Sequence, residues 1–273
     1  MKIIRRRAGN GFPLRLRRPV FWRGLGEFMR TIRIFAYFLY LLVINRYKLS
    51  EDVERNYGVA KEICRKTFLS AGITVEKIDH DNIPETPGVV IVPNHKSLFD
   101  IMALILVVDR TMGTVAAKEM YIPFLRKYIS AIGCVRIDRY IDSPVDKEEV
   151  VRTQKKIVSL LSGGYCLTIF PEGRLVPGDD LGEFRTASFN APKKTDAYIV
   201  PTYIHGSEGI NRKGRWFCFP KAHIVISFGK AIKPSEAGVS NTTELCDVVR
   251  ERILEQKDEI MQALTGSRKA TVV

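Results

Sequence analysis

The fold is decided by the stretch Gly88-Val89-Val90-Ile91-Val92-Pro93-Asn94-His95-Lys96-Ser97-Leu98-Phe99-Asp100. The apolar run at its start predicts a buried strand, which delivers His95 to the end of a sheet. Positions five apart on one regular helix diverge by about 140°, so His95 and Asp100 would not meet there. They can meet if His95 lies in the loop and a helix begins near Ser97, with Asp100 in its first turn. Asp100 could then hold the imidazole in one tautomer, which predicts a general base and its orienting group.

Strand-like and helical segments alternate along most of the remaining chain. Further strands are expected at residues 114–117, 165–170, 198–204 and 223–228, and helices at residues 51–71, 98–108, 123–132, 147–161 and 242–264. A chain of 273 residues is long enough to bury a full core. The alternation predicts an α/β fold, with a mainly parallel sheet flanked by helices.

Polar residues follow three of the expected strands. Lys118 ends the strand at 114–117, and Pro171-Glu172-Gly173-Arg174 directly follows the strand at 165–170. His205 follows the strand at 198–204. Ligands of such sheets gather beyond the carboxyl ends of the strands, so these residues and His95 suggest a shared cleft. A single His or Lys at such a place is also compatible with a purely structural role.

The positive charge is concentrated at the N-terminus. The formal net charge is +13, and residues 1–30 hold nine Lys and Arg against Glu27 alone. Such an arm seeks an anionic surface, either lipid or nucleic acid. The uncharged, mostly apolar run at residues 34–44 follows it and favours lipid. As a helix this run is about 16 Å long, roughly half the hydrocarbon thickness, although tolerating Arg30 and Arg33 would lengthen it.

These features predict an N-terminal membrane-associating helical segment that lies in the bilayer interface, in monotopic attachment. An ordinary buried helix is the alternative, and a signal peptide is disfavoured because no small-residue cleavage site follows. We therefore divide the chain into residues 1–72, the basic arm and helical segment, and residues 73–273, the α/β domain. The five cysteines are odd in number, and no pair has metal-ligand spacing, so we expect a reduced compartment and no metal.

Four segments of this chain resemble the motifs of the glycerolipid acyltransferases, a family that includes lysophosphatidic acid acyltransferases. The first is His95 through Asp100, which is similar to the family's His-x-x-x-x-Asp. The others are Gly133-Cys134-Val135-Arg136-Ile137-Asp138-Arg139, Phe170-Pro171-Glu172-Gly173 and Val200-Pro201-Thr202. Their order and spacing agree with the family from about residue 85 to residue 230.

The resemblance implies an acyl transfer from a thioester, acyl-CoA or acyl carrier protein, to the free hydroxyl of lysophosphatidic acid, giving phosphatidic acid. His95 would be the base and Asp100 its orienting group. Lys118 and Arg139 would bind the phosphate of this lysophospholipid acceptor, while Glu172 and Gly173 would shape the acceptor site. The resemblance implies no further cofactor and no nucleic acid partner. With the anionic surface that the basic arm seeks, we expect monotopic attachment at the cytoplasmic face of a membrane.

One departure from the family leaves the acceptor open. The third motif of the family usually continues Thr-Arg-Ser, whereas this chain has Arg174-Leu175-Val176. Arg174 could reach a phosphate from one residue earlier, but its side chain would start in another direction. Another lysolipid acceptor and a non-catalytic basic protein that binds lipid or nucleic acid remain alternatives. Arg139 could instead pair with Asp138 or Asp142. His205-Gly206-Ser207-Glu208-Gly209 resembles a nucleophile elbow but lacks its first Gly, which disfavours a serine hydrolase.

Overall fold

The computed structural model describes residues 20–117, 120, 121, 123, 125–137, 147–176, 178, 180–210 and 221–270. The helices are α1 (Val20–Asn45), α2 (Val53–Ala71), α3 (Asp100–Val107), α4 (Arg126–Ala131), α5 (Lys147–Ser162), α6 (Asn190–Thr195) and α7 (Thr242–Ala270). The strands are β1 (Thr74–Ile78), β2 (Val89–Pro93), β3 (Met112–Ala117), β4 (Val135–Ile137), β5 (Cys166–Thr168), β6 (Tyr198–His205) and β7 (His223–Phe228).

The strands form one seven-stranded sheet in the order β1-β7-β6-β2-β5-β3-β4. All neighbouring strands run parallel except β6 and β7, which are antiparallel. The predicted mainly parallel α/β fold is therefore confirmed. Strand β2 lies between β5 and β6, with Ile91 opposite Thr168 and Pro93 opposite Thr202. The carboxyl ends of these three strands consequently meet at one edge of the sheet.

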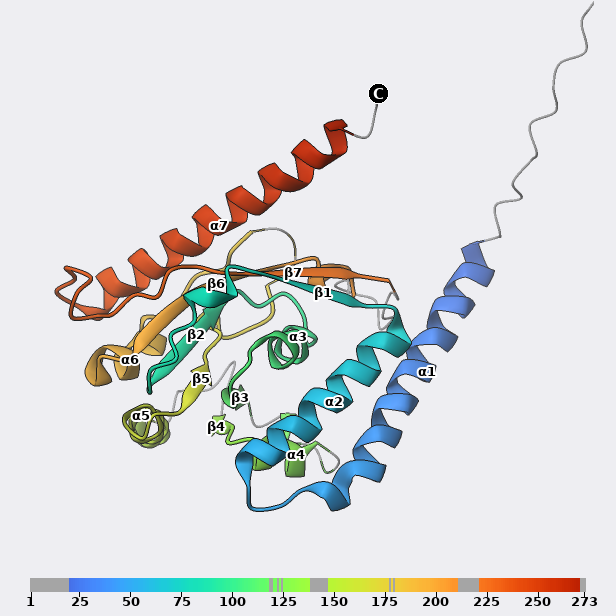
Figure 1. Ribbon diagram of the computed structural model, residues 1–273, viewed down its shortest axis with the longest axis horizontal. Coiled ribbons are helices and arrows are strands. Elements are labelled where there is room, and N and C mark those ends of the chain that lie inside the picture. Colours follow the sequence, from blue (N-terminus) through green and yellow to red (C-terminus); the bar gives the residue numbers. More distant parts are fainter. Residues whose placement is uncertain are drawn as a thin grey trace, which may run out of the picture.

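Helices cover both faces of the sheet (Figure 1). Side chains alternate along a strand, so Val89 and Ile91 pack with α2 and α3, while Val90 and Val92 pack on the face of α5, α6 and α7. All five residues of β2 are buried. This explains why the strand is a continuous apolar run, since a strand covered on both faces has no solvent side.

Two strands lie outside the sequence prediction. Strand β1 is an edge strand with charged residues and no buried position, so it lacks the apolar signal of a core strand. Strand β4 has only three residues, too few for a periodic pattern. Helix α3 begins at Asp100, three residues after the expected start near Ser97. The backbone N–H groups of Lys96 and Ser97 bond to the Asp100 carboxylate, which holds them in the loop before the helix.

Helix α1 is longer than the apolar run that predicts it. It has 26 residues and includes Arg30 and Arg33, so it extends about 39 Å. By length and composition, residues 28–48 are sufficient to cross a membrane. One face of α1 nevertheless packs against protein, because Leu41 and Leu42 form a buried cluster with Ile63 of α2 and Tyr128 of α4. Figure 1 shows α1 and α2 side by side outside the sheet.

Helix α2 ends at Ala71 and is capped by Gly72, which has a left-handed backbone with φ of 68°. Gly72 is also the last residue of the first of the two expected segments, residues 1–72 and 73–273. The side chains of Tyr57, Cys64 and Phe68 on α2 are nevertheless part of the core that covers one face of the sheet. The division into two units stays a prediction.

Candidate functional site

The candidate site lies at the carboxyl end of β2. After Pro93 the chain leaves the sheet at Asn94, whose side chain is fully buried. Its amide nitrogen donates to the backbone oxygen of Ile204 on β6 at 3.0 Å, and its amide oxygen accepts from the backbone nitrogen of Ile204 at 2.7 Å. These two bonds fix the start of the loop to the neighbouring strand. His95 therefore leaves the sheet from a rigid position.

His95 and Asp100 lie side by side, as their spacing led us to expect. The distance between His95 Nδ1 and Asp100 Oδ2 is 3.0 Å, and the same oxygen accepts from the backbone nitrogens of Lys96 at 2.7 Å and Ser97 at 2.8 Å. The Asp100 side chain is completely buried. An ionised carboxylate can only accept hydrogen bonds, which places the imidazole proton on Nδ1. Nε2 is left as the nitrogen that can take a proton.

The imidazole of His95 is also held from one face. The ring of Phe170, which follows β5, stacks on it with ring centroids 4.0 Å apart and an angle of 29° between the planes. The His95 side chain is 17 % exposed, so solvent or a ligand reaches only part of it. The sequence placed Phe170 at the end of a strand but assigned it no role. Only its place at a strand end was visible in the sequence, because the fold decides that β5 lies beside β2.

Glu172 connects this loop to the segment after β5. Its Oε2 accepts from the backbone nitrogen of His95 at 3.1 Å, and its Oε1 accepts from the backbone nitrogen of Gly182 at 3.0 Å. The side chain is buried, and this burial raises the pKa of the Glu172 carboxyl above its ordinary value. Glu172 therefore acts on the backbone around His95, while Asp100 acts on the imidazole.

The described part of residues 173–185 folds back onto the same loop. The backbone nitrogen of Val176 donates to the backbone oxygen of His95 at 2.9 Å. Lys96 is buried, and its ammonium donates to the backbone oxygen of Asp180. The backbone nitrogen of Arg185 donates to the oxygen of Pro171 at 2.9 Å. Sequence reasoning missed Lys96 and Arg185, because nothing local to either residue indicates which loop it will contact.

Glycine at position 173 is favoured by the backbone conformation, and the Arg185 side chain lies directly over it. It has a φ of 67°, in the left-handed region that favours glycine. A Cβ atom added there would lie 2.7 Å from Nε of Arg185. Arg174, the neighbouring residue that we expected to contribute to phosphate binding, is exposed. Lys118 and Arg139, the other two expected phosphate ligands, lie outside the described residues and stay predictions.

The described cysteines, and the serine of the predicted degenerate elbow, are buried. Burial raises the pKa of the thiols of Cys64 and Cys166 to about 12 and that of Cys134 to about 11, so none is a thiolate near neutral pH. Ser207, at the predicted degenerate elbow, is fully buried in a short 3-10 helix, residues Ser207–Gly209. The described residues also contain no group of three or more His, Cys, Asp or Glu side chains placed to hold a metal ion.

Comparisons with known proteins relate this chain to acyltransferases. The family described as "Acyltransferase" matches residues 74–205, which hold His95, Asp100 and Glu172. The chain is 30 % identical over 169 residues to the 1-acyl-sn-glycerol-3-phosphate acyltransferase of Helicobacter pylori, covering 61 % of this chain and 67 % of that protein. It is 27 % identical over 187 residues to the chloroplastic 1-acyl-sn-glycerol-3-phosphate acyltransferase LPAT1 of Arabidopsis thaliana, covering 68 % of this chain and 49 % of that protein.

A probable 1-acyl-sn-glycerol-3-phosphate acyltransferase of Mycoplasma pneumoniae is 29 % identical over 143 residues, covering 50 % of this chain and 52 % of that protein. The chain thus spans about half the length of the Mycoplasma pneumoniae and Arabidopsis thaliana relatives. Among solved structures, the acyltransferase PlsC of Thermotoga maritima superposes with a TM-score of 0.72 at 22 % identity. That match covers 86 % of this chain and 98 % of PlsC, and it shows a shared fold.

Proposed function

Because the chain belongs to the acyltransferase family, we propose that it transfers a fatty acyl group from a thioester to the free hydroxyl of lysophosphatidic acid, giving phosphatidic acid. One observation carries this proposal. The His95–Asp100 pair leaves Nε2 of a rigidly held imidazole without a hydrogen-bond partner among the described residues, at the partly open edge of the sheet. The names of the relatives support the choice of acceptor.

The proposed reaction uses His95 as a general base. Nε2 takes the proton of the acceptor hydroxyl while the hydroxyl oxygen attacks the carbonyl carbon of the thioester. The carbon–sulfur bond breaks, an ester forms, and the imidazolium returns the proton to the thiolate that leaves. Asp100, 3.0 Å from Nδ1, stabilises the imidazolium in between. The buried described thiols and the buried Ser207 support direct transfer, without an acyl-enzyme.

We assign the acceptor to the space beside Glu172 and Gly173, with Lys118, Arg139 and Arg174 as candidate ligands of its phosphate. Acyl-CoA and acyl carrier protein are both thioesters, and the base chemistry is the same for either. The proposed reaction consumes the thioester as a co-substrate and needs no further cofactor. An assay with each of the two thioesters is therefore needed to identify the acyl donor.

The test is an acyl-transfer assay with the purified full-length chain. Acceptors are lysophosphatidic acid, lysophosphatidylethanolamine, lysophosphatidylcholine and monoacylglycerol, each with acyl-CoA and with acyl carrier protein thioester. We expect kcat/KM to be highest for lysophosphatidic acid with one of the two donors. A higher value for another acceptor, or no turnover of lysophosphatidic acid with either donor, contradicts the proposal.

The face of α1 that points away from the protein supports membrane attachment. Its exposed large apolar residues are Phe28, Met29, Ile32, Phe35, Leu39, Tyr40, Val43 and Ile44. The opposite face is occupied by α2 and α4, so lipid could not surround α1 on all sides without removing those contacts. We therefore propose that α1 lies in the interface of an anionic, cytoplasmic membrane surface, in monotopic attachment.

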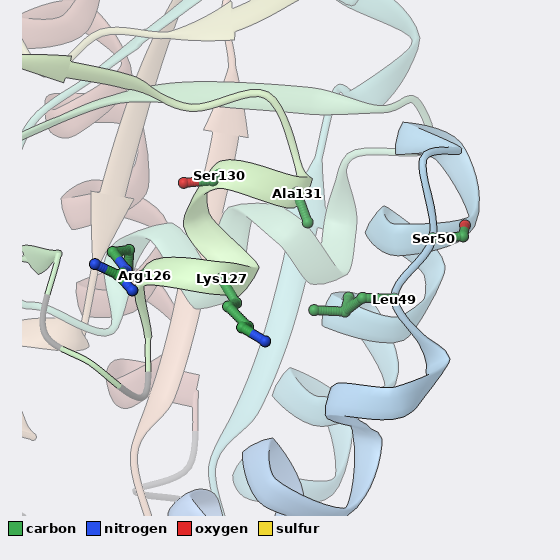
Figure 2. A pocket seen from close by; sticks show the side chains of 6 residues that line it. All are labelled: Leu49, Ser50, Arg126, Lys127, Ser130 and Ala131. Carbon is green, nitrogen blue, oxygen red and sulfur yellow. The ribbon is translucent and has the colours of Figure 1, made fainter.

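Cations lie near the C-terminal end of this apolar face. Arg46 and Lys48 follow α1 directly. The next residues of the chain, Leu49 and Ser50, line a shallow groove of about 420 Å³. Its other lining residues are Arg126, Lys127, Ser130 and Ala131 of α4. Figure 2 shows Lys127 of α4 pointing toward Leu49 across this groove, with Arg126 on the other side of the helix. Arg46 and Lys48, at the end of α1 itself, suit the phosphates of an anionic bilayer.

Replacing Phe35, Leu39 and Val43 together by Ser should lower partition onto anionic liposomes by about tenfold or more, because each loses apolar burial. The control is Leu69→Ser, which removes an exposed Leu from α2. Sedimentation with liposomes measures the effect, and salt should weaken binding only in part, since screening does not affect apolar burial. Sedimentation of the triple variant like the wild type would show that α1 is not the attachment.

A further inference from the structure

The side chain of Arg185 lies against Gly173 of the third motif, although Arg185 comes ten residues after Leu175 in the sequence. A Cβ atom at Gly173 would lie 2.7 Å from Nε of Arg185 and 3.1 Å from its Cδ and Cζ. The guanidinium therefore occupies the space over the Gly173 backbone that a side chain would otherwise fill. Gly173 directly follows Glu172, whose Oε2 accepts from the backbone nitrogen of His95 at 3.1 Å.

The backbone of Arg185 is fixed on both sides. Its nitrogen donates to the oxygen of Pro171 at 2.9 Å, and its oxygen accepts from Ser188 at 2.9 Å in the short helix of residues Thr186–Phe189. The preceding residue, Phe184, stacks on Phe189 with ring centroids 6.5 Å apart. A cation on such a fixed backbone loses little freedom when it binds a ligand, which favours recognition.

The guanidinium is available to an anion. Arg185 is exposed, and no carboxylate among the described residues forms an ion pair with it. The adjacent carboxylate, Glu172, is buried and already accepts from His95 and Gly182. Arg174 and Leu175 differ from the residues that the family usually has at those positions, and Arg174 follows a left-handed glycine that redirects the chain.

We propose that Arg185, seated on Gly173, binds the phosphate of the acceptor and supplies the charge that position 175 lacks in this chain. This inference rests on the proposed function and names a specificity-determining residue for it. A guanidinium binds phosphate through two parallel N–H···O bonds, so Arg185 selects a phosphorylated acceptor. Because Gly173 is one residue from Glu172, the phosphate lies close to the loop that carries His95, as a glycerol phosphate requires.

The test compares Arg185→Ala and Arg185→Lys with the wild type, at saturating thioester. Arg185→Ala should raise the KM for lysophosphatidic acid about 10- to 100-fold, since hydrogen bonds to a charged group are strong. The KM for the thioester should change less than about twofold, and Arg185→Lys should restore part of the loss. The matched control is Arg152→Ala on α5, where the guanidinium is 75 % exposed.

Three results would overturn the inference. The first is an equal rise in the KM of both substrates, and the second is a fall in melting temperature with unchanged kinetics, which would make Arg185 a structural strut. The third is a larger rise in the KM for lysophosphatidic acid in Arg174→Ala than in Arg185→Ala.

A binding measurement separates this inference from the proposed reaction. Glycerol 3-phosphate should raise the melting temperature of the wild type and protect Arg185→Ala much less. If the wild type binds glycerol 3-phosphate through Arg185 but acylates no lysophosphatidic acid, the proposed function fails and the phosphate site stands. If the wild type acylates lysophosphatidic acid and Arg185→Ala binds glycerol 3-phosphate equally well, the phosphate site fails alone.

Discussion

Two histidine–carboxylate pairs among the described residues have almost equal lengths but differ in how far they are buried. His95 Nδ1 lies 3.0 Å from Asp100 Oδ2, and His223 Nε2 lies 2.9 Å from Glu76 Oε2. The side chains of the first pair are 17 % and 0 % exposed, whereas those of the second are 53 % and 55 % exposed. The distance between the two groups therefore says little about what a pair can do. What a pair can do depends on how far its side chains are buried and on whether the second ring nitrogen of the histidine can take a proton.

The second pair belongs to the surface. His223 begins β7 and its other ring nitrogen, Nδ1, contacts the hydroxyl of Thr74 at 2.9 Å, so both nitrogens are engaged. Water weakens the attraction between exposed charges, which leaves such a pair worth little. The Asp100 carboxylate beside His95 is instead fully buried, and it also accepts hydrogen bonds from two backbone N–H groups. Only the first pair combines a fixed imidazole with a nitrogen ready to take a proton.

The largest expected effect comes from removing the two imidazoles in turn. His95→Ala should lower kcat/KM by about 10²–10⁴-fold, the usual contribution of a positioned base. His223→Ala should leave it within about twofold, because the pair at the edge of the sheet touches no proposed site residue. Steady-state acyl-transfer kinetics measure both, and unchanged melting temperatures confirm folding. Comparable losses in the two variants would remove the distinction between the pairs.

The next effect separates orientation from charge. Asp100→Asn should lower kcat by about 10²-fold with little change in KM, because the amide cannot stabilise the imidazolium as the carboxylate does. Asn keeps an oxygen for the N–H groups of Lys96 and Ser97, whereas Ala would leave both unpaired and cost stability. Glu76→Gln is the matched change in the exposed pair and should be kinetically silent. Wild-type turnover by Asp100→Asn would show that the carboxylate is only structural.

The smallest effect concerns the buried Glu172 behind His95. Burial raises the pKa of this carboxyl in the folded state, so folding favours its protonated form. Its contribution to stability is present below the unfolded pKa of about 4.3 and is lost as pH rises through the folded pKa. The free energy of unfolding of the wild type, relative to Glu172→Gln, should therefore fall as pH rises from about 4 toward neutral.

The control for this slope is Glu62→Gln. Arg65 and Lys66 lower the pKa of the partly exposed Glu62 carboxyl to about 2, which is the opposite direction. Its contribution is complete above the unfolded pKa and is lost only as pH falls toward about 2, so the difference from the wild type should be flat in the same range. Denaturant titrations at several pH values measure both differences. A rising difference for Glu172 would show that its hydrogen bonds outweigh its burial.

Local signals predicted the central strand and the contact that follows it. The run at β2 is apolar at every position because both faces of the strand are covered, and this is visible in sequence. The spacing from His95 to Asp100 indicated a loop followed by a first helical turn, and the 3.0 Å contact agrees. The start of α3 at Asp100 was missed, because it depends on how the carboxylate bonds to Lys96 and Ser97. The roles of the site residues stay predictions.

The amino-acid sequence by itself determined the alternation of strands and helices, the mainly parallel sheet and the place of His95 at a strand end. Each depends on apolar periodicity and on residues within one turn or one strand of each other. Tertiary structure alone decided that Phe170 stacks on His95, that Lys96 reaches Asp180 and that Arg185 covers Gly173. These contacts join segments that are up to 84 residues apart, and which side chains meet there depends on how loops pack once the sheet has formed.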